Sequence, residues 1–166
     1  LEFMPEGEMR FGRTMFAVLF RPSYFTQSSS KGSTDYKLSG FTLMPMLRLY
    51  PLENSFIKFF MQAGLGYGSL SGDLTNAASS VKFSGSAMGY SAGLGANFCF
   101  TDAHCLVIEG NYRYLPIERN VASSATGTVA GLTQATTNKE VEDSNGNDMS
   151  TTMSGLQGVI GYRMNF

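Results

Sequence analysis

Apolar and polar side chains alternate residue by residue through most of this chain, and this period of two limits its fold more than any other feature. Successive side chains of a β-strand point to opposite faces of the sheet, whereas a helix repeats its faces every 3.6 residues. The alternation therefore predicts strands with one apolar and one polar face. It covers six segments: residues 9–27, 35–50, 55–70, 82–99, 104–116 and 149–166.

Three glycines in the stretch MQAGLGYG, residues 61–68, follow the same period of two. A dinucleotide-binding loop needs a strand, a tight glycine turn and a helix whose N-terminus faces the phosphate. Here Gly64, Gly66 and Gly68 share one face of a predicted strand instead. This face is bare of side chains, and we interpret it as pointing into a narrow barrel. There it either leaves room for larger inward side chains or permits strong bending.

The composition fits a barrel that crosses a membrane with strands. Charged residues make up 15% of the chain and aromatic residues 13%, and 19 of the 166 residues are glycine. No apolar run is long enough for a transmembrane helix, and a net charge of −1 gives no basic field for nucleic acid. Short turns and long polar loops alternate between the segments, as in outer-membrane barrels. Residues 1–166 are therefore predicted to form one all-β domain, an antiparallel, up-and-down transmembrane β-barrel.

Aromatic residues mark both ends of the apolar rows, although alternation alone also fits a soluble sandwich with an apolar core. One group lies near the long loops: Tyr24, Tyr36, Tyr67, Tyr112 and Tyr114. The other lies near the short turns: Tyr50, Phe56, Phe98, Tyr162 and Phe166. Two such rings are typical of the interfacial girdles of membrane barrels. The membrane interpretation is therefore favoured.

The stretches FTLMPMLRLY (41–50) and FIKFFMQAGLGYG (56–68) resemble two consecutive strands of the small outer-membrane β-barrel proteins of the OmpA/OmpX-like group. SAGLGANFCFTDAHCLVIEGNYRY (91–114) resembles the next hairpin of that family, and the closing GVIGYRMNF resembles its terminal strand. The resemblance implies the outer membrane of a Gram-negative-type bacterium, with the bilayer and lipopolysaccharide as neighbours. It also implies that the assembly machinery reads the last strand, through Phe166 and Tyr162.

The resemblance implies eight strands, but only six are visible. The missing pair lies either within residues 117–148, where GTVAGLTQATT is a weak hairpin pattern, or upstream of residue 1. Closure by an oligomer is a third alternative. The upstream location is favoured, because the first segment aligns best with the family's third strand. Residues 1–3 are either native or a cloning remnant.

The polar face carries charged residues that predict a network inside the barrel. Buried charges must be paired or hydrated. Glu109 is the one acid that the pattern places in the middle of a strand, and it is expected at the centre of the network. Its predicted partners are Arg48, Lys58, Arg113 and Arg163. Such a network either plugs the barrel or forms a cation-rich constriction that favours anions.

Two cysteines flank the short turn 100–104 and share the inward face. Cys99 and Cys105 are therefore predicted to form a cross-strand disulfide in an oxidising periplasm, the alternative being two free thiols. A metal site is disfavoured because His104 is the sole histidine.

The functional prediction is non-catalytic, without a cofactor, and nucleic acid is not a predicted partner. Barrel enzymes that modify lipids use a histidine near the outer leaflet, whereas His104 lies in a short turn at the other end. No phosphate-binding loop or nucleophile elbow is present. We expect a structural or surface-interaction role in the envelope, with 117–148 as a mobile loop or a contact for an extracellular partner. The alternatives are a small pore with weak anion preference and a soluble lipocalin-like barrel that binds an apolar ligand.

Overall fold

The computed structural model describes residues 2–12, 14–31, 33–129, 132, 135–143 and 145–165. This part of the chain is all-β, and none of it forms a helix that could cross a membrane. The larger sheet has the antiparallel order β1-β3-β4-β5-β6-β7-β11, with β2 beside β3 and β9 beside β6, while β8 and β10 pair separately. The strands are β1 (Glu2–Phe3), β2 (Gly7–Arg10), β3 (Phe16–Lys31), β4 (Thr34–Glu53), β5 (Ile57–Thr75), β6 (Ser80–Cys99), β7 (His104–Tyr114), β8 (Pro116–Ile117), β9 (Val121–Thr126), β10 (Thr151–Thr152) and β11 (Gly155–Met164).

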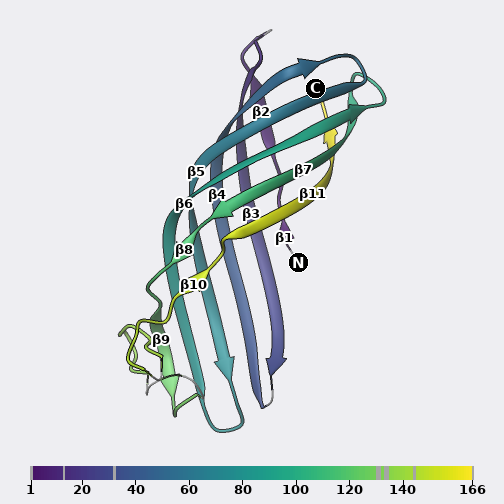
Figure 1. Ribbon diagram of the computed structural model, residues 1–166. Helices are drawn as coiled ribbons and strands as arrows, with labels where there is room; N and C mark the ends of the chain where they lie inside the picture. The colour runs from purple at the N-terminus through teal and green to yellow at the C-terminus, as the bar shows by residue number, and fades with distance from the viewer. Residues whose placement is uncertain are drawn as a thin grey trace.

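The larger sheet curls into an open half-barrel (Figure 1). β1 and β2 follow each other along β3 and act as one interrupted strand, so the sheet has seven strand positions. This strand and β11 are the two edges, and no backbone ladder joins them among the described residues. The prediction of an all-β antiparallel sheet is confirmed.

The start of the chain differs from the prediction, because residues 9–27 are not one strand. A turn that includes residues 11, 12, 14 and 15 separates β2 from β3, and β1 and β2 form an additional, interrupted strand within residues 2–10. Gly12 adopts a φ of 57°, a left-handed conformation that glycine reaches without steric cost. The alternation of polarity continues through this turn, so the pattern alone hid it.

Residues 117–148 do not provide the missing pair of barrel strands within their described part. Only β9 joins the larger sheet, and it pairs with the far end of β6. Ile117, Val129 and Val141 are buried instead of solvated. The described part of this segment therefore packs against the sheet, where the sequence predicted a mobile loop or a hairpin.

The half of the sheet near the short turns carries its apolar side chains on the outside. This turn-end section comprises residues 7–24, 41–68, 88–114 and 155–165. Outward-facing Leu65, Leu94 and Ile160 are 68%, 68% and 78% exposed, while inward-facing Arg48 is 1% exposed. The section is thus apolar outside, as the alternation predicted, while its inside combines buried charges with two small apolar clusters, Ala17, Tyr50 and Phe60 in one and Leu19, Met44 and Met46 in the other.

The half near the long loops has the opposite polarity. This loop-end section comprises residues 25–39, 69–87 and the covering segment 115–153. Its outward positions on β3–β6 carry Ser, Thr, Lys and Asp. Its inner face and the covering segment form an apolar core of Leu70, Leu74, Val81, Phe83, Leu115, Ile117, Ala122, Val129, Val141 and Met153. This section is built like a water-soluble β-domain.

The alternating glycines of β5 and β6 lie on the inner face, where neighbouring chain segments approach closely. A Cβ added at Gly66 would lie 2.3 Å from the backbone oxygen of Leu43 and 2.5 Å from the sulfur of Met44. At Gly95 it would lie 2.5 Å from the ring of Phe60. The bare face is therefore occupied by its neighbours.

Replacing Gly66 with Ala is expected to lower the free energy of unfolding by about 1–3 kcal/mol, because backbone must shift to admit the methyl group. Gly110→Ala is the matched control, since a Cβ there meets nothing within 4 Å. That control is expected to be neutral or slightly stabilising, because alanine restricts the unfolded chain. Urea unfolding of both variants measures the contrast, and equal stabilities would contradict it.

Candidate functional site

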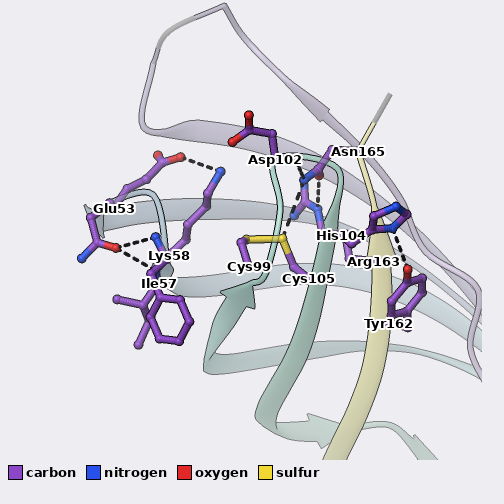
Figure 2. Close-up of a disulfide and its surroundings, with 12 residues drawn as sticks. Glu53, Ile57, Lys58, Cys99, Asp102, His104, Cys105, Tyr162, Arg163 and Asn165 are labelled. Carbon is purple, nitrogen blue, oxygen red and sulfur yellow. Dashed lines mark hydrogen bonds and ion pairs between the residues drawn. A yellow bond between two sulfur atoms is a disulfide. The ribbon is translucent and has the colours of Figure 1, made fainter.

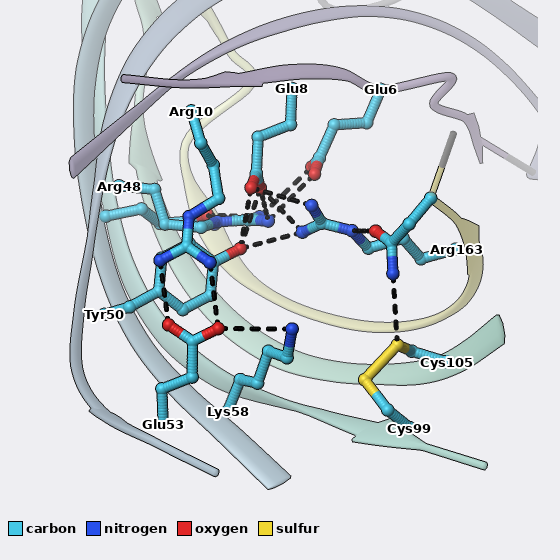
Figure 3. A network of polar contacts seen from close by, with 12 residues as sticks. Glu6, Glu8, Arg10, Arg48, Tyr50, Glu53, Lys58, Cys99, Cys105 and Arg163 are labelled. Atoms are coloured by element: carbon cyan, nitrogen blue, oxygen red, sulfur yellow. Dashed lines mark hydrogen bonds and ion pairs between the residues drawn. A yellow bond between two sulfur atoms is a disulfide. The ribbon is translucent and has the colours of Figure 1, made fainter. Parts of the chain in front are cut away.

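Charged and polar side chains converge on the inner face of the turn-end section (Figure 3). β3, β4, β5, β7 and β11 contribute to them, and so do β2 and the residue just before it. Residues two apart share a face of a strand, so the alternation that turns apolar side chains outward turns these inward. The group, called the inner network, comprises Glu6, Glu8, Arg21, Arg48, Tyr50, Gln62, Glu109, Asn111 and Arg163.

Glu109 is the centre of one group of contacts within the inner network. Its carboxylate accepts hydrogen bonds from Arg21 at 2.6 and 3.0 Å, and it lies 3.4 Å from Arg48. The side-chain amides of Asn111 and Gln62 donate to it at 2.7 and 3.3 Å. Arg21 is on β3 and Glu109 on β7, so this pair spans the interior of the curled sheet.

Arg48 connects the contacts around Glu109 with those around Glu6 and Glu8. It donates to Glu6 at 2.9 Å, to Glu8 at 2.6 Å, and to Gln62 at 2.6 and 2.9 Å. Its guanidinium carbon lies 4.0 Å from the ring centre of Phe60. Removal of this buried cation would leave carboxylates without their partner.

Glu8 and Arg163 link the two edges of the open sheet. Arg163, on β11, donates two hydrogen bonds of 2.8 Å to Glu8, on β2. The hydroxyl of Tyr50 donates to Glu8 at 2.9 Å and accepts from Arg163 at 2.7 Å. The edges are thus joined by side chains where no backbone ladder exists.

A second ionic cluster lies at the turn between β4 and β5. Arg10 donates to Glu53 at 2.8 and 2.9 Å, and the Lys58 ammonium lies 3.2 Å from the same carboxylate (Figures 2 and 3). The hydrogen bonds from Arg10 are the main reason why the pKa of Glu53 falls from 4.5 to about 2. Glu53 therefore stays ionised at any ordinary pH.

The interior charges balance. Nearer the loops, Arg113 donates to Glu2 at 2.8 Å and to the carbonyl of Met153 at 2.9 Å, and Gln157 donates to Glu2 at 2.9 Å. On the inner face of the described chain, four carboxylates thus meet four guanidiniums: Glu2, Glu6, Glu8 and Glu109 with Arg21, Arg48, Arg113 and Arg163.

The sequence predicted four cations beside Glu109. Of these, the structure places only Arg48 there. The other three pair with different acids: Lys58 with Glu53, Arg113 with Glu2 and Arg163 with Glu8. The prediction left Glu53 in the short turn after residue 50, and it lacked Glu2 and Glu8 because residues 2–10 were not recognised as a strand. The period-two acids of PEGEMR, residues 5–10, are the signal that could have revealed it.

A cavity of about 790 Å³ opens beside the inner network at the turn end. Its lining includes Glu6 and Glu8 next to one sheet edge and Val159, Tyr162 and Arg163 on the other. The cavity therefore lies along the opening between β2 and β11.

Cys99 and Cys105 are joined by a disulfide across β6 and β7, as their positions predict (Figure 2). Both residues are buried, and the side-chain amide nitrogen of Asn165 lies 3.7 Å from the Cys105 sulfur. The bond therefore fixes the short turn next to the end of β11.

Tyr162 and His104 form a contact on the outer surface of the same turn. The Tyr162 hydroxyl lies 2.6 Å from Nδ1 of His104, and the two rings stack. Tyr162 is 66% exposed on β11, while Phe166, the other predicted assembly residue, lies outside the described residues.

The described groups of this site make ion pairs and hydrogen bonds with one another. No group of three histidine, cysteine or acidic side chains in the described chain is placed to hold a metal. Searches of protein-family models, curated proteins and solved structures find no match to this chain.

Proposed function

We propose that this chain is an outer-membrane β-barrel protein with a non-catalytic role in envelope structure or surface interaction. The observation that carries the proposal is the reversal of polarity along the sheet. The turn-end section exposes apolar rows and buries charges, whereas the loop-end section exposes polar residues and buries an apolar core. A protein surrounded only by water would have no reason to reverse its polarity in this way. A bilayer around one half of the sheet supplies the reason, because it favours apolar side chains on the outside of that half.

The dimensions of the apolar rows support a bilayer. On β3 the row runs from Phe16 to Tyr24, and on β11 from Leu156 to Met164. A tilted transmembrane β-strand needs about 9–11 residues to cross the hydrocarbon. Tyr24, Tyr67 and Tyr114 lie at the loop end of the rows, as in an interfacial girdle, whereas Tyr36 and Tyr50 of the predicted girdles face the interior.

The directions of the strands support closure by an eighth strand. With seven antiparallel positions, the edge strands β1/β2 and β11 run in the same direction. Bacterial outer-membrane barrels have an even number of antiparallel strands, and one strand antiparallel to both edges would give that number. Because the acids and arginines of the interior are balanced, we expect the inward face of that strand to carry small or uncharged side chains.

A sealed barrel is favoured over the alternatives. Among the described residues of the inner face, four arginines are matched in number by four acids, which leaves no excess of arginine there to select anions. The apolar core of the loop-end section fills the other end of the interior. A lipocalin-like barrel requires an apolar interior at mid-height, where this chain has the inner network.

The same proposal orients the chain. The short turns and the disulfide lie in the oxidising periplasm, and the loop-end section faces outward past a leaflet of lipopolysaccharide. Residues 117–148 then belong to the external surface, where an extracellular partner would meet them. β11 is the strand that the assembly machinery reads.

Tryptophan fluorescence tests the membrane band, because the chain contains no tryptophan of its own. Leu65→Trp and Ser71→Trp place a reporter on the same face of the same strand, inside and outside the band. In vesicles of dibrominated phosphatidylcholine, the reporter at position 65 is expected to be strongly quenched and the one at 71 weakly.

Heat-dependent gel migration of the same samples shows that both variants are folded. Equal quenching of two folded variants would contradict the band. Conductance in a planar bilayer separates a sealed barrel, which is expected to be silent, from a pore.

A further inference from the structure

We infer that the outer face of the loop-end section binds the phosphorylated sugar headgroup of a glycolipid in the surrounding leaflet, with Lys37 and Lys82 as its cationic contacts. The inference rests on the proposed membrane function and adds a specific site to it. The two lysine amines would meet phosphate, and the neighbouring hydroxyls would meet sugar.

The strand register places the site residues in two transverse rows. Lys37 on β4, Asp73 on β5 and Lys82 on β6 are consecutive cross-strand partners. The row on their membrane side consists of hydroxyl side chains: Thr26, Ser39, Ser71 and Ser84. A hollow of about 680 Å³ is lined by both rows.

The position of the rows matches the depth of lipid headgroups. Phe41 is the last aromatic residue of the band on β4, and Lys37 lies four residues beyond it on the same face. Four residues span about 13 Å along a strand, or about 10 Å along the membrane normal for a strand tilted by about 40°. Lysine side chains extend back toward the interface over a distance of several ångströms, so both amines reach the headgroup layer.

The charges favour an anion. Lys37 is exposed and forms no ion pair within the described residues, and Lys82 is 59% exposed with its amine 3.8 Å from Asp73. Such a long, exposed ion pair contributes little and leaves the amine free to bind. The described residues of β3–β6 in this section carry no exposed large apolar side chain on their outward face, and Val121 on β9, 40% exposed, is the one that lies beside them, so the site lacks the large aromatic anchor of a typical protein interface.

Titration of the folded protein in detergent with diphosphoryl lipid A, followed by native mass spectrometry, tests the site. Each lysine near an anionic membrane contributes about 1 kcal/mol, so K37A/K82A is expected to raise the dissociation constant about tenfold or more. Lys139→Ala, which removes one exposed lysine off the two rows, is the control and is expected to bind like the parent. Asp73→Asn is expected to bind more tightly, because the competing carboxylate is removed.

Each of the following outcomes would overturn the inference. Unchanged binding by K37A/K82A, weaker binding by D73N, or equal losses in K139A exclude the proposed contacts. Displacement of lipid A by 10 mM inorganic phosphate would assign the lysines to free phosphate instead of a headgroup. The tryptophan-quenching assay on the same preparations keeps the two proposals apart, because a protein that spans the bilayer without lysine-dependent lipid A binding refutes only the headgroup site.

Discussion

Replacing Arg48 with Met is expected to lower the free energy of unfolding by about 3–5 kcal/mol, the usual cost of removing one partner from a buried ionic cluster. Arg48 is the cation shared by Glu6, Glu8 and Glu109. Methionine retains much of the aliphatic stem, so the loss comes from carboxylates left without a partner. Urea titration of protein folded in phosphatidylcholine vesicles, read by gel migration, measures it.

Two further variants separate this effect from a general loss of packing. Arg119→Met removes an arginine that is 73% exposed and 3.5 Å from Glu140, and a change below about 1 kcal/mol is expected there. Adding Glu6→Gln to Arg48→Met restores the interior charge balance and is expected to recover at least about 1 kcal/mol. A loss for Arg48→Met as small as that of the exposed control would refute the buried network.

Placing an arginine at Leu94 is expected to cost about 2–4 kcal/mol in a bilayer, the measured range for cations at the midplane of a barrel's lipid face. Leu94 lies in the middle of the outward row that runs from Met88 to Phe98 on β6, and it is 68% exposed. In water, an arginine at so exposed a position would cost little. The measurement is the free energy of folding into vesicles, by urea titration.

Ser84→Arg is the matched control for that experiment, because it lies on the same face of the same strand within the loop-end section. A cost below about 1 kcal/mol is expected there, since polar surroundings solvate the new charge. Equal costs at positions 84 and 94 would mean that no lipid boundary separates them. The apolar rows would then need another explanation, such as a protein partner.

The direction of side chains was determined by the sequence alone, because it depends on a local period. Residues two apart share a face wherever a strand forms, so the outward position of Leu65 and the inward position of Arg48 follow from the pattern. The disulfide was equally local, since Cys99 and Cys105 flank one short turn and the register of a hairpin follows from its turn. The strands predicted over residues 35–50, 55–70, 82–99 and 104–116 lie where the alternation placed them, whereas the predicted strand 149–166 is divided into β10, which pairs with β8, and β11 in the larger sheet.

Only the tertiary structure decided which inward charges meet. Arg21 and Glu109 are far apart in sequence and on strands that are not neighbours, so their contact depends on how tightly the sheet curls. Residues 2–10 became partners because they pair with β3, a long-range choice that alternation does not encode. The packing of residues 115–153 over the loop-end core is of the same kind. A period of two specifies the face of each side chain, but not the curvature that brings opposite walls together.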